Sequence, residues 1–167
     1  MEPKIIRAQL VDLLTKSNAH MTFAEAVADF PPEHYNTRPP QTPYTFWHLL
    51  EHIRLAQRDI LDFIRNPDYQ ARNWPEDYWP PQNELADSRA WEKTIRAFYA
   101  ELDEIVAIIS DPQIDVTGEL PYAPGYTYLR EFLLVGDHNA YHIGEFAILR
   151  GVLGLWKKSD KPEKEKI

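Results

Sequence analysis

The chain of 167 residues has no cysteine, which excludes disulfides, cysteine nucleophiles and thiolate metal ligands. It has no apolar run near the ~20 residues that a membrane-spanning helix needs, and its start, MEPKIIRAQL, does not resemble a secretory signal. Asp and Glu outnumber Lys and Arg, 26 to 18, so the net charge of −8 argues against binding to nucleic acid or an anionic membrane. We expect a cytoplasmic protein in which nitrogen and oxygen atoms hold any metal.

Strand-like alternation is also absent, and apolar residues recur at helical spacing instead. The pattern predicts one all-α domain over residues 1–155 and a charged tail, 156–167, that we expect to fray. The connections at 66–85 and 111–125 are rich in proline and look irregular. The predicted helices cover about residues 3–17, a short piece at 22–30, Thr42 or Thr45 to Arg65, Asp87 or Ser88 to about Ile109, and about 127–150.

Four of the six histidines form two His-x-x-x-His pairs on separate predicted helices. The first pair is His48 and His52, and the second is His138 and His142. A spacing of four places two side chains on one helical face, one turn apart. Neutral imidazole is a common ligand for borderline transition metals. Two such pairs on facing helices could supply three or four ligands to one metal ion.

The two histidines of the first pair differ in their position around the helix. At about 100° per residue, His52 falls at the edge of the apolar arc, and His48 lies further toward solvent. Asp59 lies two turns after His52 on the same line. His52 is therefore the better placed of the two histidines to point into a bundle. The alternative is that His52 is a boundary residue with a single hydrogen bond.

The second pair lies on a helix that is apolar nearly all round, and such a helix is mostly buried. One narrow stripe is polar: Glu131, His138, His142 and Glu145 fall within about 60° of one another. Buried polar groups are costly unless they are hydrogen-bonded or bind a metal, so the stripe indicates a common partner. The alternative is an internal His–Glu hydrogen-bond network. The two glutamates could orient the imidazoles, or Glu145 could be a fourth ligand.

Other candidate residues carry weaker signals. A di-iron carboxylate site needs two Glu-x-x-His motifs, which this chain lacks in that order on two helices. His20 and His34 lie in or near predicted loops, and we interpret both as surface residues. Tyr78 and Trp79 fall in the long connection, where they either pack beneath it or line a substrate pocket.

Two segments, WHLLEHIRLAQRDIL and LVGDHNAYHIGEFAILR, resemble the DinB-like superfamily. That superfamily includes the YfiT-like proteins and the bacillithiol and mycothiol S-transferases. The resemblance covers the chain up to the tail and implies an up-down-down-up four-helix bundle, often dimeric. It also implies a metal site made by His52, His138 and His142. By the same resemblance, His48 precedes the usual ligand by one turn, and Glu145 stands where the family often has glutamine.

Three histidines with an open position describe a catalytic rather than a structural zinc site. The resemblance implies that the metal, Zn, Ni or Fe, activates an exogenous low-molecular-weight thiol. We therefore expect a metal-dependent thiol S-transferase or a related hydrolase acting on a small molecule. The alternative is a non-catalytic, stress-associated metal-binding bundle. Because the last helix is apolar on more faces than one core needs, we also expect a homodimer.

Overall fold

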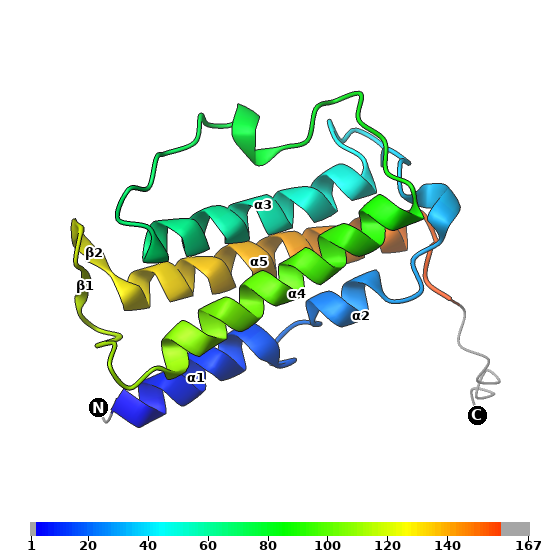
Figure 1. The fold of residues 1–167 in the computed structure, drawn as a ribbon. Coiled ribbons are helices and arrows are strands. Elements are labelled where there is room, and N and C mark those ends of the chain that lie inside the picture. Colours follow the sequence, from blue (N-terminus) through cyan, green and yellow to red (C-terminus); the bar gives the residue numbers. More distant parts are fainter. Residues whose placement is uncertain (1–2, 158–167) are drawn as a thin grey trace, which may run out of the picture.

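The structure is a computed structural model, and it describes residues 3–157. Within that range the chain is mostly helical, as predicted, with long helices that pack alongside one another (Figure 1). The α-helices are α1 (Pro3–Thr15), α2 (Phe23–Val27), α3 (Phe46–Arg65), α4 (Ser88–Ser110) and α5 (Tyr128–Val152). Two short 3-10 helices are η1 (Pro32–His34) and η2 (Glu76–Tyr78).

A small antiparallel hairpin lies in the connection at 111–125 that the sequence pattern predicts as irregular. Its strands are β1 (Glu119–Leu120) and β2 (Ala123–Thr127). The register shifts between Glu119 and Leu120, so the strands are too short and too irregular for alternation to appear in the sequence. The hairpin lies at the end of the bundle where α4 leads into α5 (Figure 1).

Side-chain caps begin the three longest helices. Thr45, rather than Thr42, caps α3, and its hydroxyl accepts a hydrogen bond from the backbone N–H of His48 at 3.2 Å. Asp87 and Thr127 cap α4 and α5 in the same way. The cap at Thr45 fixes the start of α3, and with it the angular position of every later side chain on that helix.

The core is divided into two apolar clusters, one toward each end of the bundle. Aromatic side chains dominate the cluster around the first half of α3, where the rings of Tyr35 and Trp91 stack at 4.1 Å. The other cluster surrounds the second half of α3 and is mainly aliphatic. Between them, buried Gln57 accepts a hydrogen bond from Asn139 at 2.9 Å. The histidines of α3 and α5 therefore lie where the interior is already polar.

The long connection between α3 and α4 runs back along α3 (Figure 1). It covers one side of α3, so side chains on that side are buried although they face away from the other helices. This placement decides the environment of both histidines of the first pair.

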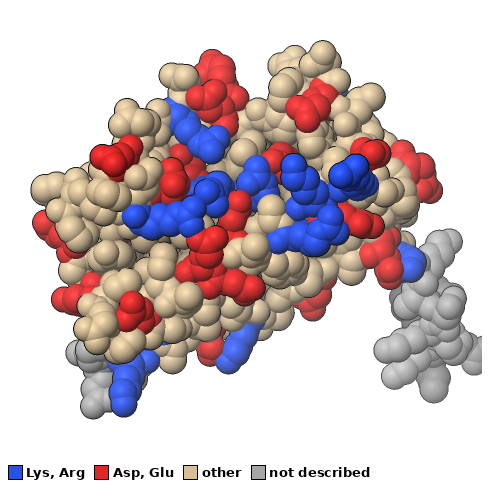
Figure 2. Space-filling view, viewed as in Figure 1, with Lys and Arg blue, Asp and Glu red and all other residues tan. Residues whose placement is uncertain are grey.

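Acidic and basic side chains are intermixed on the face of the molecule shown in Figure 2. None of the helices described between residues 3 and 157 is long and apolar enough to cross a membrane. The tail predicted from residue 156 lies, from residue 158 onward, outside the described residues. Of its first two residues, Trp156 packs beneath the Arg150 guanidinium at 4.0 Å, and Lys157 pairs with Asp29 at 2.9 Å.

Candidate metal centre

Three of the four paired histidines meet where α3 packs against α5. The Nε2 atom of His52 lies 3.2 Å from Nε2 of His142 and 3.3 Å from Nε2 of His138. One ring nitrogen from each residue lies within 4.8 Å of the others. These are the three residues that the sequence pattern and the family resemblance predict as metal ligands. His52 is buried, and the two histidines of α5 are partly buried.

Hydrogen bonds on the far side of two rings determine where the protons are. Nδ1 of His52 donates to the backbone carbonyl of Tyr78 at 2.7 Å, since a carbonyl can only accept. Nδ1 of His142 likewise donates to the Glu145 carboxylate at 2.7 Å. In a neutral imidazole the other nitrogen then carries a lone pair. When both rings are neutral, the Nε2 lone pairs of His52 and His142 face each other.

Burial keeps two of the rings neutral. It lowers the pKa of His52 from 6.5 to about 4, although the Tyr78 carbonyl acts in the opposite direction. Burial and the neighbouring His142 and His52 also lower the pKa of His138 to about 4. At neutral pH, His52 and His138 are therefore neutral, and a neutral imidazole can offer one ring nitrogen to a metal ion.

The spacing of these nitrogens fits a transition metal. Zn–N bonds of about 2.0–2.1 Å place neighbouring ligand atoms about 3.3–3.4 Å apart in a tetrahedron and about 2.8–3.0 Å apart in an octahedron. The observed distances of 3.2 and 3.3 Å lie between these values. The residues present therefore fit one divalent ion of the kind that nitrogen ligands prefer.

Two of the three rings belong to a closed loop of side chains that contact one another. The Trp79 ring stacks on His52 at 3.9 Å with an interplanar angle of 2°, and Tyr44 stacks on Trp79 at 5.0 Å. The Tyr44 hydroxyl donates to Glu145, the same carboxylate that accepts from His142. Burial acts to raise the pKa of Glu145, but the hydrogen bonds from His142 and Tyr44 outweigh it and hold that pKa below its ordinary value. Glu145 thus orients His142 as an anion, from the side away from the other rings.

His48 does not lie toward solvent, so that part of the sequence interpretation is wrong. Only 3% of the residue is exposed, because the connection after α3 folds over it. Its Nε2 donates to the carbonyl of Pro81 at 3.0 Å, and its Nδ1 contacts the Thr45 hydroxyl. Both ring nitrogens are thus occupied by the protein, and His48 is outside the three-histidine cluster.

Glu131 also does not reach the cluster. It shares an angular stripe with His138 but lies seven residues earlier on α5, about 10 Å along the helix axis. Its buried carboxylate contacts Arg130 at 2.5 Å. His20 is exposed and His34 is partly buried, and both lie outside the cluster, as expected.

Two features of the surroundings are hard to read from the sequence. Tyr44 carries no special signal, and the contact from Tyr78 to His52 is made by a backbone carbonyl. The signal that could have found Tyr78 is the position of Asp59, on the same line of α3 as His52. Asp59 accepts the Tyr78 hydroxyl at 2.6 Å and so draws the connection onto this face of the helix.

A cavity of about 570 Å³ adjoins the stacked pair of Tyr44 and Trp79. Prolines form much of its wall, together with His48, and Glu76 and Gln82 lie at its border. Its volume falls within the range of about 300–1,000 Å³ that is usual for small-molecule sites. Tyr44 and Trp79 are the two side chains that link this cavity to the histidine cluster.

The fold and the site together are those of a helical-bundle protein with one candidate transition-metal site. Three imidazoles from two helices converge at that site. A family model described as the DinB superfamily matches residues 17–146, which is most of the chain. The chain belongs to the DinB superfamily. No curated protein and no solved structure matches the chain.

Proposed function

We propose that this DinB superfamily protein binds one divalent metal ion through Nε2 of His52, His138 and His142 and is a metal-dependent enzyme. One observation carries the proposal: Nε2 of His52 lies 3.2 Å from Nε2 of His142 and 3.3 Å from Nε2 of His138, while the opposite nitrogens of His52 and His142 donate to fixed acceptors. Facing lone pairs in a buried site are costly unless a cation lies between them. The nitrogen ligands suit Zn, Ni or Fe.

A bound metal at such a site supplies Lewis acidity and lowers the pKa of a coordinated water or thiol. The chain's own residues prepare that position. Burial holds two imidazoles neutral, the Tyr78 carbonyl and Glu145 fix two ring orientations, and Trp79 shields one face of His52 from water. Three protein ligands leave at least one position for a small molecule.

For the reaction, we favour transfer of a low-molecular-weight thiol to an electrophile, or a related hydrolysis. The chain has no cysteine, so the thiol would be a separate cofactor. Among the residues described, no fourth carboxylate or imidazole joins the three histidines, which supports an open position. The cavity beside Tyr44 and Trp79 offers a place for a small organic substrate.

The alternative is a non-catalytic, stress-associated protein in which the ion mainly links α3 and α5. One observation favours it: none of the four cavities described within residues 3–157 is lined by any of the three histidines. A metal held without direct access to a cavity would stabilise the bundle instead of meeting a substrate.

Elemental analysis of the purified protein tests the proposal, and a thiol-transfer screen separates the two functions. We expect about one Zn, Ni or Fe per chain. We expect turnover with at least one of bacillithiol, mycothiol, glutathione and coenzyme A in the presence of an electrophile. A metal content near zero that cannot be restored by added Zn²⁺, Ni²⁺ or Fe²⁺ would contradict the metal site. Full metal content without turnover would favour the non-catalytic alternative.

The arrangement of the helices belongs to the same proposal. We expect the up-down-down-up order of the family for the four long helices, α1, α3, α4 and α5. The connection that runs back along α3 supports this order, because it allows α4 to begin at the same end of the bundle as α3 (Figure 1). A cytoplasmic location also stays a prediction.

We further propose a homodimer that uses the outer face of α5. Tyr141, Ile148 and Val152 recur at helical spacing on that face, and each is 65–70% exposed. We expect a dimer by light scattering at tens of micromolar, and a monomer after Ile148→Glu. Leu85→Glu is the matched control, because Leu85 is 71% exposed but lies in the connection before α4. A monomeric wild-type mass at that concentration would overturn the dimer.

A further inference from the structure

One buried carboxylate of α3 gathers three side chains from the long connection. Asp59 is only 8% exposed. Its Oδ1 atom accepts from the Tyr69 hydroxyl at 3.0 Å and lies 3.3 Å from Nε of Arg72. Its Oδ2 atom accepts from the Tyr78 hydroxyl at 2.6 Å. All three partners lie within ten residues of one another, in a segment whose only helix is the three-residue η2.

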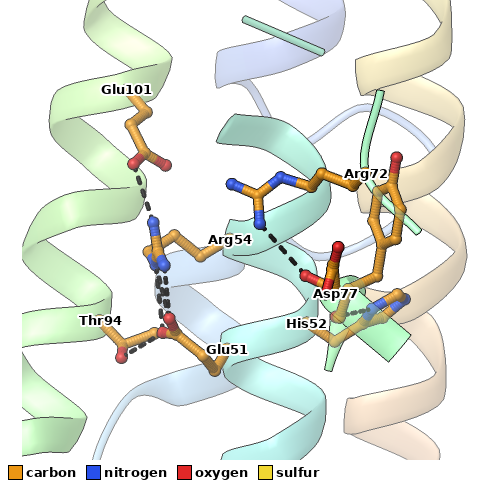
Figure 3. Close-up of polar contacts among 8 residues, drawn as sticks. Glu51, His52, Arg54, Arg72, Asp77, Thr94 and Glu101 are labelled. Atoms are coloured by element: carbon orange, nitrogen blue, oxygen red, sulfur yellow. Dashed lines mark hydrogen bonds and ion pairs between the residues drawn. The ribbon is translucent and has the colours of Figure 1, made fainter. Parts of the chain in front are cut away.

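The same segment also contacts the candidate metal centre. The Tyr78 carbonyl accepts from Nδ1 of His52 at 2.7 Å, and the next residue, Trp79, stacks on the His52 ring. Figure 3 shows His52 and Arg72 on the side of α3 away from Arg54. Tyr78 therefore links Asp59 to His52: its hydroxyl contacts one residue and its carbonyl the other.

Local hydrogen bonds hold the turn before that carbonyl, where the Tyr78 N–H donates to the Pro75 carbonyl at 3.2 Å. The helix η2 that ends at Tyr78 has no side-chain cap. Contacts that lead back to Asp59 hold Tyr78, which carries that carbonyl, through its side chain and through the peptide that precedes it. The Tyr78 hydroxyl reaches Asp59, and Arg72 also contacts Asp59. Arg72 in turn donates to the Asp77 carbonyl at 3.2 Å, as Figure 3 shows.

We propose that Asp59 is a positioning residue for the metal site, although it touches none of the three histidines. By holding Tyr78, Asp59 fixes the acceptor for Nδ1–H of His52, and so fixes the tautomer and the ring orientation of that ligand. The inference rests on the proposed metal site for its effect on affinity. Partners that orient a metal-binding histidine typically change metal affinity by about 10–100-fold when they are removed.

Two tyrosine variants give a matched test of this role. Tyr78→Phe and Tyr69→Phe each remove one hydroxyl from Asp59, but only Tyr78 has a backbone contact with His52. In competition titrations with Zn²⁺ and a chromophoric chelator, we expect Tyr78→Phe to weaken binding by about tenfold and Asp59→Asn by about 10–100-fold. We expect a clearly smaller loss for Tyr69→Phe. Equal losses for the two tyrosine variants would overturn the proposal.

A double-mutant comparison separates positioning from a general loss of stability. In a His52→Ala background, His138 and His142 remain as a weaker two-histidine site. There, Asp59→Asn should leave the residual Zn²⁺ affinity unchanged, because Asp59 acts through His52. An undiminished loss in that background would show that Asp59 acts on the fold as a whole, and would contradict the proposal.

A measurement on the metal-free protein keeps this inference separate from the proposed function. The Nδ1–H of His52 should give a slowly exchanging proton signal in nuclear magnetic resonance spectra, because it donates to a carbonyl in a buried site. We expect that signal to be lost in Asp59→Asn and Tyr78→Phe and kept in Tyr69→Phe. If the wild type binds no metal, the metal site fails, but this signal still decides the role of Asp59. Its persistence in both Asp59→Asn and Tyr78→Phe would refute that role.

Discussion

The two polar clusters on opposite sides of α3 differ in how their charges are balanced. On the side of α4, the Arg54 guanidinium lies between two carboxylates, 2.5 Å from Glu51 and 3.0 Å from Glu101 (Figure 3). The Thr94 hydroxyl also donates to Glu51 at 2.6 Å. One guanidinium thus lies between two carboxylates, and the cluster takes its donors from within the chain. One atom, Oε2 of Glu101, is buried without a partner.

On the side of α5, the three histidines present like groups to one another. Their Nε2 atoms converge, and the donors that would neutralise them face outward, toward Tyr78 and Glu145. Buried polar groups require partners, and at the point of convergence these ring nitrogens have only one another. The α4 cluster is thus completed mainly by side chains of the chain itself, whereas the three histidines form a group that could hold a metal ion.

The largest effect should follow removal of one converging nitrogen. We expect His142→Ala to weaken metal binding by more than about 100-fold, beyond the range typical for residues that only orient a ligand. Elemental analysis after dialysis against a weak chelator would measure the retained metal.

His48→Ala is the matched control for that loss. This histidine is buried on the same helix as His52, but both of its ring nitrogens contact Thr45 and Pro81. The variant should lose about 1–3 kcal/mol of unfolding free energy and keep most of its metal. Metal lost by His48→Ala and retained by His142→Ala would reverse the assignment.

The next largest effect should be a loss of stability, without loss of metal, when the α4 cluster is disrupted. Arg54→Met leaves buried Glu101 and partly buried Glu51 without their cation, which should lower the unfolding free energy by about 3–5 kcal/mol. Arg96→Met is the control, since Arg96 and its partner Glu92 are more than 60% exposed and should contribute less than about 1 kcal/mol. Urea unfolding measures both. Loss of metal stoichiometry in folded Arg54→Met would show that the two clusters are not independent.

Helical periodicity predicts the helices, the position of His52 at the edge of its apolar arc and the second histidine pair on a buried helix. It leaves three or four ligands open, and the choice of His52, His138 and His142 as one set comes from the family resemblance. Angle says nothing about height, however. Glu131 shares the stripe of His138, but it lies about 10 Å away along α5 and contacts Arg130 instead.

The covering of α3 by the long connection could not be predicted in this way. The segment has no period, and its contacts are made by a backbone carbonyl at Tyr78, ring stacking at Trp79 and a carbonyl at Pro81. Periodicity therefore placed His48 toward solvent, because it describes a helix without its neighbours. The general physical rule is that buried polar side chains need hydrogen-bond partners, and here the irregular connection supplies them.

The smallest effect should be the response of the unfolding free energy to acid, which should have opposite signs for the two clusters. Burial lowers the pKa of His52 and of His138 from 6.5 to about 4. Between those pH values the unfolded chain binds more protons than the folded one, so acid destabilises the metal-free protein. Burial raises the pKa of Glu101 despite the nearby Arg54. The folded state therefore binds a proton at Glu101 more readily than the unfolded state does. For this reason the contribution of Glu101 to stability weakens as the pH rises.

Urea unfolding of chelator-treated protein between pH 7 and pH 4.5 measures this difference, with one Gln substitution in each cluster. We expect wild-type stability to fall with acid through this range. The fall should be shallower in His138→Gln, which removes one neutral buried imidazole, and steeper in Glu101→Gln, which removes the opposing carboxyl. Each proton difference changes the slope by at most about 1.4 kcal/mol per pH unit. If both variants change the slope in the same direction, the clusters do not titrate independently, and the contrast between the two sides of α3 does not hold in solution.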